Sequence, residues 1–310
     1  MKTILSLLVI AALALACSSE PDTTPEMLDG GLLFDPSIYK PALYLVSKAI
    51  PNPTPEQARR PVIIACHGYS ATTFEWDEFR AFLGGRTDVF LSQVLLGGHG
   101  RSYDDFKKST WHDWQAAITA EYDALVKAGY QNISLLGSST SGPLLLELVA
   151  SGYFANRPAP RNLLLVDPII IPSDKTLSLI GVVGPMLGYV DSEQPAVEDK
   201  VYYHFRPQET LQQLQTVLNV VRKDLEKGVT LPATCALKVY KSKQDSSADP
   251  VSAVLIYNGV KTAQGQPIDL DLIDSDLHVY TRLTLRETVT AQDKTNQTAT
   301  FADITRRVLR

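Results

Sequence analysis

The fold is decided by one stretch of the chain, Ile133–Gly142, which reads I-S-L-L-G-S-S-T-S-G. Strand-forming residues run directly into a small-x-Ser-x-small turn, and a leucine-rich segment with helical character follows. This order predicts a sharp strand-to-helix turn that lifts one serine clear of a sheet, the turn called a nucleophile elbow. A Ser/Gly-rich loop before a helix could instead be a plain turn or an anion site.

Spacing selects Ser139 from the four consecutive hydroxyl residues of this stretch. Because the turn crowds the backbone, the residues two before and two after the nucleophile must be small. Gly137 and Ser141 flank Ser139 in this way. The same rule applied to Ser138 or Ser141 places a leucine or a proline at a crowded position.

A serine nucleophile needs a base, and in hydrolases with this elbow the acid and then the histidine follow the serine along the chain. Only His204 and His278 follow Ser139. His278 comes just after Ile268–Ile273, an alternating run that predicts a late strand, and it lies in a loop-like segment. His204 precedes an amphipathic helix and is interpreted as a packing or capping residue. The order therefore predicts His278 as the base.

Two aspartates compete for the role of the acid. Asp245 follows Leu237–Lys241, a short predicted strand, in a polar loop. Asp167 ends the predicted strand Leu163–Val166 and could also reach an imidazole. The loop after the penultimate strand is the commoner location, which favours Asp245, while Asp167 stays open as the alternative.

A second sequence pattern predicts which backbone groups donate hydrogen bonds to an oxyanion. Pro61–Gly68 reads P-V-I-I-A-C-H-G, a buried-strand pattern that ends in His-Gly. This arrangement predicts that the backbone N–H of Tyr69 faces the site, with the N–H of Thr140 as the second donor. The side chain of His67 is interpreted as structural.

From about Pro61 to the C-terminus the chain resembles an α/β hydrolase of the carboxylesterase and monoacylglycerol-lipase kind. The matching pieces are, in order, H-G-Y-S-A-T, G-G-H-G-R-S, G-S-S-T-S-G, Q-D-S-S-A-D-P and S-D-L-H-V. The resemblance implies a mostly parallel sheet flanked by helices with an inserted cap. It also implies Ser139 as nucleophile, Asp245 as acid, His278 as base, and the amides of Tyr69 and Thr140 as oxyanion donors.

Two positions depart from the family pattern. Ser141 stands where members usually have glycine, which exchanges one small residue for another. Leu277 replaces the small residue often found before the histidine, which affects the expected loop geometry rather than the assignment.

The N-terminus predicts export and lipidation. Lys2 is followed by the apolar run Ile4–Leu15, which is too short to span a bilayer and fits a signal peptide over 1–16. Ala14–Cys17 reads A-L-A-C and resembles a bacterial lipobox, with Cys17 as the lipidated first residue of a flexible tether over 17–35. Ser18 favours the outer membrane as destination. Ordinary signal cleavage with Cys17 as a bystander remains the alternative.

Composition bounds the remaining functions. The formal net charge is −5, and no basic stripe predicts a nucleic-acid partner. No His/Cys cluster has metal-ligand spacing, and Gly97–Ser102 lacks the pattern of a dinucleotide site, so no metal or cofactor is expected. Cys66 and Cys235 belong near strands that are not neighbours in this fold, so no disulfide is expected. Length and hydrophobic content predict one α/β domain over 36–310.

From Val62 onward, strand-like runs alternate with helical patterns. The segment over about 170–232 breaks this alternation, which predicts an inserted cap. Its second part, Glu209–Lys227, predicts a helix that packs mostly on the core. Its first part is an apolar set with interspersed glycines, predicted to line an acyl pocket: Leu177, Leu179, Ile180, Val182, Val183, Met186 and Leu187, with Gly181, Gly184 and Gly188.

The whole pattern predicts a lipid-anchored serine hydrolase of carboxylic esters with small to medium acyl groups, with monoacylglycerol or lysophospholipid as candidates. Thioester hydrolysis or acyl transfer by the same three residues is the alternative among enzymes. A surface lipoprotein that uses the scaffold only for binding is the alternative outside them.

Overall fold

A computed structural model describes residues 20–24, 27–28, 50–175, 177, 180, 184 and 187–310. The predicted signal peptide, Cys17 and most of the predicted tether lie outside these residues. In the part of the chain that is described, no helix combines the length and apolar character needed to cross a membrane.

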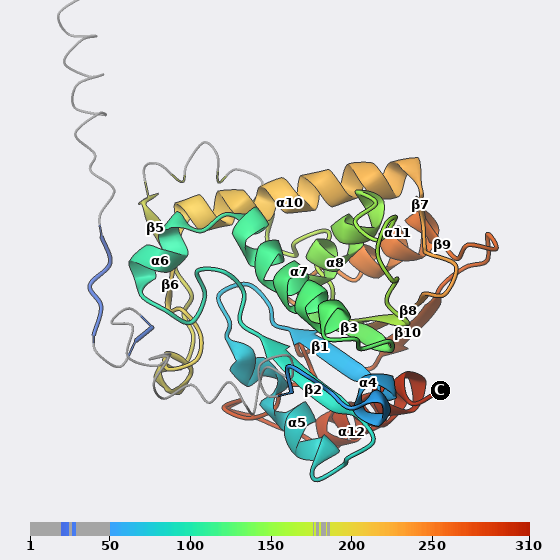
Figure 1. The fold of residues 1–310 in the computed structure, drawn as a ribbon. Helices are drawn as coiled ribbons and strands as arrows, with labels where there is room; N and C mark the ends of the chain where they lie inside the picture. The colour runs from blue at the N-terminus through green and yellow to red at the C-terminus, as the bar shows by residue number, and fades with distance from the viewer. Residues whose placement is uncertain are drawn as a thin grey trace, which may run out of the picture.

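A six-stranded parallel sheet forms the centre of the molecule (Figure 1). The strand order is β10-β8-β4-β3-β1-β2. The strands are β1 (Val62–Cys66), β2 (Phe90–Val94), β3 (Ile133–Ser138), β4 (Asn162–Val166), β8 (Ala236–Ser242) and β10 (Asp269–Ile273). Every residue of β1, β3 and β4 is buried, as expected for parallel strands covered on both faces.

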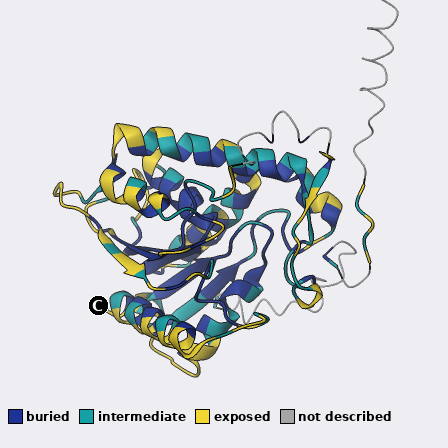
Figure 2. Ribbon diagram, turned by 180° about the vertical axis from the view of Figure 1, so that it is seen from behind, coloured by how far each residue is buried: buried dark blue, intermediate teal, exposed yellow. Residues whose placement is uncertain are grey.

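Helices cover both faces of the sheet (Figure 1). The helices are α4 (Pro55–Arg59), η1 (Thr73–Trp76), α5 (Asp77–Leu83), α6 (Tyr103–Lys108), α7 (Trp111–Lys127), α8 (Ser141–Ala150), η3 (Ala196–Glu198), α10 (Gln208–Lys227), α11 (Val251–Gly259) and α12 (Ala291–Val308). Figure 2 shows the sheet as the most deeply buried layer, with exposed residues on the outer sides of the helices.

Alternate residues of each strand pack into separate cores on the two faces. Ile64 belongs to the larger core, which includes Trp114 of α7. Ile63 belongs to the smaller core with Phe79 of α5 and Phe301 of α12. This division follows from the strand period of two, because successive side chains point to opposite faces.

The segment between β4 and β8 carries the region predicted as a cap. It holds the antiparallel pair β5 (Tyr189–Asp191) and β6 (Phe205–Pro207), and then α10, which packs across α8 and α11. Between α10 and β8 lies β7 (Val229–Thr230), which pairs with β9 (Val260–Lys261) outside the main sheet.

Helices α7 and α4 both begin with capping boxes. At the start of α7 the Thr110 side chain accepts from the Asp113 amide. The proline-rich segment 50–60 contains the helix α4. Thr54 and Gln57 form a capping box that stabilises this helix despite the neighbouring prolines.

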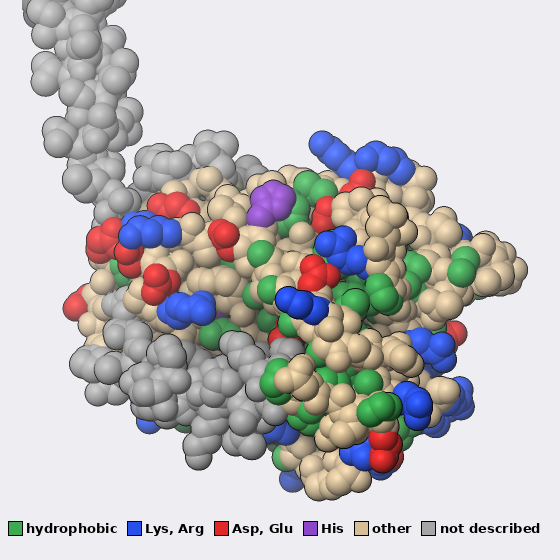
Figure 3. Space-filling view, in the orientation of Figure 1, with side chains coloured by type: hydrophobic (Ala, Val, Ile, Leu, Met, Phe, Trp, Pro, Cys, Tyr) green, Lys and Arg blue, Asp and Glu red, His purple; other side chains and the backbone are tan. Residues whose placement is uncertain are grey.

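Cys66 and Cys235 are free, buried thiols. Cys66 belongs to β1 and Cys235 directly precedes β8, and β4 and β3 lie between these two strands in the sheet. Charged side chains of both signs are interspersed on the face drawn in Figure 3, so the described part of that face has no continuous basic surface.

Candidate active site

The predicted elbow lies between β3 and α8. Ser139 follows the last residue of β3 and has φ of 48°, in the left-handed region that side chains rarely adopt. A Cβ at Gly137 would lie 3.0 Å from the Cβ of Ser141, and a Cβ at Gly142 would lie 2.5 Å from that of Pro168. The turn therefore requires the small residues on which the sequence argument depended.

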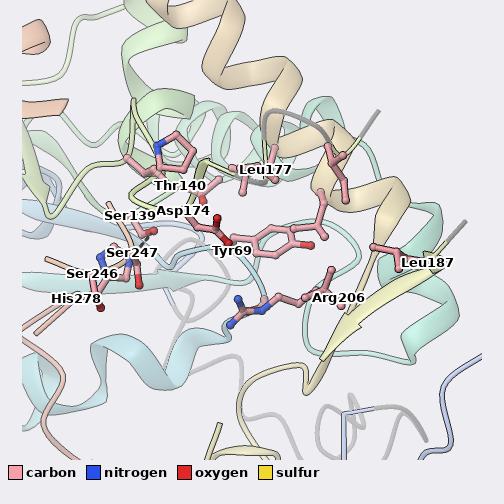
Figure 4. A pocket seen from close by; sticks show the side chains of 17 residues that line it. Tyr69, Ser139, Thr140, Asp174, Leu177, Leu187, Arg206, Ser246, Ser247 and His278 are labelled. Carbon is pink, nitrogen blue, oxygen red and sulfur yellow. Dashed lines mark hydrogen bonds between the residues drawn. The ribbon is translucent and has the colours of Figure 1, made fainter. Parts of the chain in front are cut away.

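Ser139, His278 and Asp245 form one series of hydrogen bonds. The Oγ of Ser139 lies 2.9 Å from Nε2 of His278, and Nδ1 of His278 lies 2.8 Å from Oδ2 of Asp245. An ionised carboxylate can only accept, so Nδ1 carries the proton. Nε2 of the neutral imidazole is then the acceptor for the Ser139 hydroxyl. Figure 4 shows Ser139 and His278 beside each other at one end of a cavity.

Asp245 is held by the loop after β8. Its Oδ1 accepts from the amides of Ser247 (2.8 Å) and Ala248 (2.9 Å), and its side chain has no exposed surface. Burial alone would raise the pKa of this carboxyl. The hydrogen bond and charge of His278, with the charge of Lys241, outweigh burial and lower the pKa to about 2.

Asp167, the alternative acid, lies behind Asp245 rather than against the imidazole. It is fully buried at the end of β4, and its Oδ1 accepts from the Ser242 amide at 2.7 Å. The Nζ of Lys241 lies 3.3 Å from this Oδ1 and also donates to Oδ2 of Asp245. Burial raises the pKa of Asp167. The structure thus brings Asp245, not Asp167, into contact with His278.

Lys241 was not singled out from the sequence. Its side chain has no exposed surface, and its ammonium connects the two buried carboxylates. The only signal was a lysine at a strand position four residues before Asp245. Asp167, Asp245 and His278 offer ligand atoms within 4.8 Å of one another, but the Lys241 ammonium already supplies a positive charge between the carboxylates.

The predicted oxyanion loop passes close to the nucleophile. A Cβ at Gly68 would lie 3.0 Å from the Cβ of Ser139, so only glycine allows this approach. Among the described residues, the amides of Tyr69 and Thr140 donate to no other protein group. Both amides are therefore available to an oxygen bound beside Ser139.

Ser141 contributes a contact that glycine could not make. Its hydroxyl donates to the carbonyl of His67 at 2.5 Å, which ties the elbow to the oxyanion loop. The His67 ring lies between Gly68 O (2.8 Å from Nδ1) and the Leu96 amide (3.1 Å from Nε2). Burial lowers the pKa of His67 to about 4, so the ring is neutral and structural, as predicted.

Glu75 is a second residue that sequence reasoning missed. Its side chain is buried and accepts from the Gly68 amide at 2.9 Å and from the Ser138 hydroxyl. These contacts connect Glu75 to both the oxyanion loop and the residue before the nucleophile.

His204, which the sequence analysis interpreted as a packing or capping residue, lies elsewhere. Its ring nitrogens lie against Asp199 (2.7 Å) and Asp191 (3.1 Å).

An apolar cavity of about 330 Å³ opens beside Ser139 (Figure 4). Three residues of the predicted acyl pocket line it, Leu177, Ile180 and Leu187. Leu211 and Leu214 of α10 line it as well, although the helix was predicted to pack mostly on the core. Of the predicted lining, Leu179, Gly181, Val182, Val183 and Met186 lie outside the described residues.

Comparison with known proteins shows which proteins this chain is similar to. No protein-family model matches the chain. A thermostable monoacylglycerol lipase of Bacillus sp. (strain H-257) is 26% identical over 220 residues, which cover 67% of this chain and 80% of that protein.

Solved structures agree on the architecture. One comes from work on LipS and LipT, two metagenome-derived lipolytic enzymes; it has a TM-score of 0.63 at 19% identity and covers 80% of this chain and 94% of its own. A soluble variant of monoglyceride lipase from Saccharomyces cerevisiae has a TM-score of 0.62 at 12% identity, with 83% and 88% covered. The predicted fold class is confirmed: the chain has the α/β-hydrolase fold, with a mostly parallel central sheet flanked by helices.

Proposed function

We propose that this protein is a serine hydrolase of carboxylic esters. The observation that carries the proposal is the series of hydrogen bonds from Ser139 through His278 to Asp245, at the end of an apolar cavity. A nucleophile, a base in contact with it and a group that orients the base are the parts that acyl transfer requires. Similarity to lipolytic enzymes and to a monoacylglycerol lipase supports ester hydrolysis as the general reaction.

The proposed reaction uses each residue in a role that its contacts support. Ser139 Oγ attacks the ester carbonyl while Nε2 of His278 takes its proton, and Asp245 stabilises the imidazolium that forms. The carbonyl oxygen becomes an oxyanion that accepts from the amides of Tyr69 and Thr140. His278 then protonates the departing alcohol, and a water molecule activated by the same histidine hydrolyses the acyl-enzyme.

The size and lining of the cavity support the proposal that the substrate has a small to medium acyl group. A volume of about 330 Å³ is at the lower end of the range for small-molecule sites, and leucine and isoleucine side chains supply much of its lining. Monoacylglycerols and lysophospholipids are candidate substrates. Thioester hydrolysis and acyl transfer would use the same three residues, so a substrate series must separate them.

The decisive experiment pairs Ser139→Ala with Ser141→Ala. Activity is measured on p-nitrophenyl esters of increasing chain length, and active serine is measured with a fluorophosphonate probe. Ser139→Ala should lose labelling and several powers of ten in turnover. Ser141→Ala should still be labelled, with a lower rate because the contact with His67 is lost. Labelling that persists in Ser139→Ala and disappears in Ser141→Ala would refute the choice of nucleophile.

We also propose that a lipid on Cys17 holds the protein in the bacterial cell envelope, with the outer membrane as the expected site. The support is the sequence alone, namely the short apolar run Ile4–Leu15 and the A-L-A-C pattern that ends at Cys17. Membrane attachment would place the proposed esterase near lipid substrates.

A further inference from the structure

A second cavity meets the first at the proposed nucleophile. It measures about 180 Å³, and Ser139, His278, Tyr69 and Arg206 are among the residues that line both cavities. Its other walls are mainly polar and charged, and they include Arg282, Arg286, Glu75, Glu198 and Tyr202. An ester whose acyl chain fills the apolar cavity would direct its alcohol portion toward this polar cavity.

Arg206 is the unusual residue of the polar cavity. It belongs to β6 and lies opposite Val190 of β5. Among the described residues, its guanidinium has no carboxylate partner, and its Nε is buried without any hydrogen bond. Figure 4 shows the guanidinium extending toward the side on which Ser139 and His278 lie. The residue as a whole is half-buried, but a buried N–H donor without a partner is costly unless a ligand accepts from it.

The other two arginines are already engaged. Arg282 donates to Glu198 Oε1 at 2.5 Å and to the carbonyl of Thr284 at 3.1 Å. Arg286 donates to the carbonyls of Arg282 (3.2 Å) and His278. These contacts fix two positive charges in the wall, so Arg206 is the arginine left to bind a ligand.

Charge in the polar cavity favours an anion. Three arginines face two glutamates among its lining residues. Glu198 is paired with Arg282, and Glu75 is occupied by the Gly68 amide and the Ser138 hydroxyl. Asp174 lines the apolar cavity, as Arg206 also does, but is absent from the lining of the polar one. The lining thus has one more arginine than glutamate, and among the described residues no salt bridge engages Arg206.

We propose that the polar cavity binds a negatively charged group, a phosphate or a carboxylate, on the alcohol portion of the ester, with Arg206 as its principal ligand. This inference rests on the proposed ester hydrolysis for its orientation of the substrate. A guanidinium matches both anions because it can donate two parallel hydrogen bonds. The site would make the enzyme select acidic esters over neutral ones of the same acyl length.

The kinetic test uses three esters with one octanoyl chain: monooctanoylglycerol, octanoylglycerate and octanoylglycerol 3-phosphate. We expect kcat/KM to be higher for the anionic esters, and Arg206→Gln to lower the ratio of anionic to neutral kcat/KM by about 10- to 100-fold, the usual range for hydrogen bonds to charged groups. Arg206→Lys should recover part of the ratio. Arg157→Gln, which removes a surface arginine paired with Asp123, is the control and should leave the ratio unchanged.

A binding measurement separates this proposal from the proposed activity. Calorimetry on the Ser139→Ala protein compares 1-O-octylglycerol 3-phosphate with 1-O-octylglycerol. In both compounds an ether replaces the carboxylic ester, so the enzyme cannot remove the octyl chain by ester hydrolysis. Tighter binding of the phosphate that is lost in Ser139→Ala/Arg206→Gln supports the site even if no ester is turned over. A preference for phosphate or for carboxylate alone also supports it and identifies the anion. Equal binding of the two ethers, together with an ester ratio insensitive to Arg206, would overturn the proposal.

Discussion

Replacing Asp245 with asparagine tests which carboxylate orients His278. In the structure, Oδ1 of Asp245 accepts from the amides of Ser247 and Ala248, and Oδ2 accepts from Nδ1 of His278. The two backbone donors decide how an asparagine would turn, because its oxygen must face them. Its NH₂ group would then face the imidazole.

This orientation selects the wrong tautomer of His278. Nδ1 would have to accept from the asparagine NH₂, so the ring proton would move to Nε2, which faces Ser139. An imidazole in this state cannot take the serine proton. We expect kcat to fall by about 10³- to 10⁴-fold, which corresponds to roughly 4 to 5 kcal/mol of barrier.

Asp167→Asn is the matched control. Asp167 accepts from Ser242 and Lys241 but does not contact the imidazole. The left-handed φ of 45° at this position also suits asparagine. Turnover should fall by less than about tenfold, while weaker hydrogen bonds should lower the free energy of unfolding by roughly 1 to 3 kcal/mol.

The assay measures kcat on a medium-chain p-nitrophenyl ester, with circular dichroism and thermal unfolding to show that both variants are folded. Loss of turnover in Asp167→Asn with Asp245→Asn nearly active would refute this reasoning. That ranking would mean that the acid follows β4 rather than β8.

Three further predictions concern the cavity, acid stability and the N-terminus. kcat/KM should rise from acetyl to medium acyl esters, by up to about 0.8 kcal/mol for each buried methylene, and then level off; a flat profile would contradict an acyl role for the cavity lined by Leu177 and Leu214. Burial opposes ionisation of Asp303, but hydrogen bonds from Tyr240 and Arg307 lower its pKa from the ordinary 3.8 to about 2. Its stabilisation is therefore complete above about pH 4 and is lost as the pH falls through 2. Asp303→Asn should cost on the order of 1 kcal/mol near pH 7 in denaturant unfolding and clearly less at pH 2, and an equal cost at the two pH values would exclude this source. Mass spectrometry of the mature N-terminus should find a diacylglyceryl group on Cys17, and an unmodified terminus would rule out the lipid anchor.

The sequence contained much of the fold because the relevant constraints are local. Fully apolar runs such as Val62–Cys66 predict buried parallel strands, and the crowding around Ser139 requires small residues within two positions of it. Chain order then pointed to His278, and the position of its loop favoured Asp245 over Asp167. The structure places Asp245 and His278 in contact with each other and His278 in contact with Ser139.

Other features depend on contacts between distant segments, and no local pattern reveals them. Lys241 reads as an ordinary strand lysine until β8 is set beside β4, which brings its ammonium against Asp167, 74 positions away. Glu75 reads as a helix residue until its carboxylate meets the Ser138 hydroxyl, 63 positions away.

Arg206 shows the same division most clearly. Its sequence neighbours give no sign of an unpaired charge, because the pairing of a charge depends on every residue around it in space. Only the tertiary packing leaves its Nε buried without a hydrogen bond, beside two cavities that Ser139 also lines. The elbow and the buried strands could thus be predicted from the sequence, because they depend on local sterics and hydrophobic periodicity. The pairing of buried charges and the shape of the cavities depend on the tertiary structure.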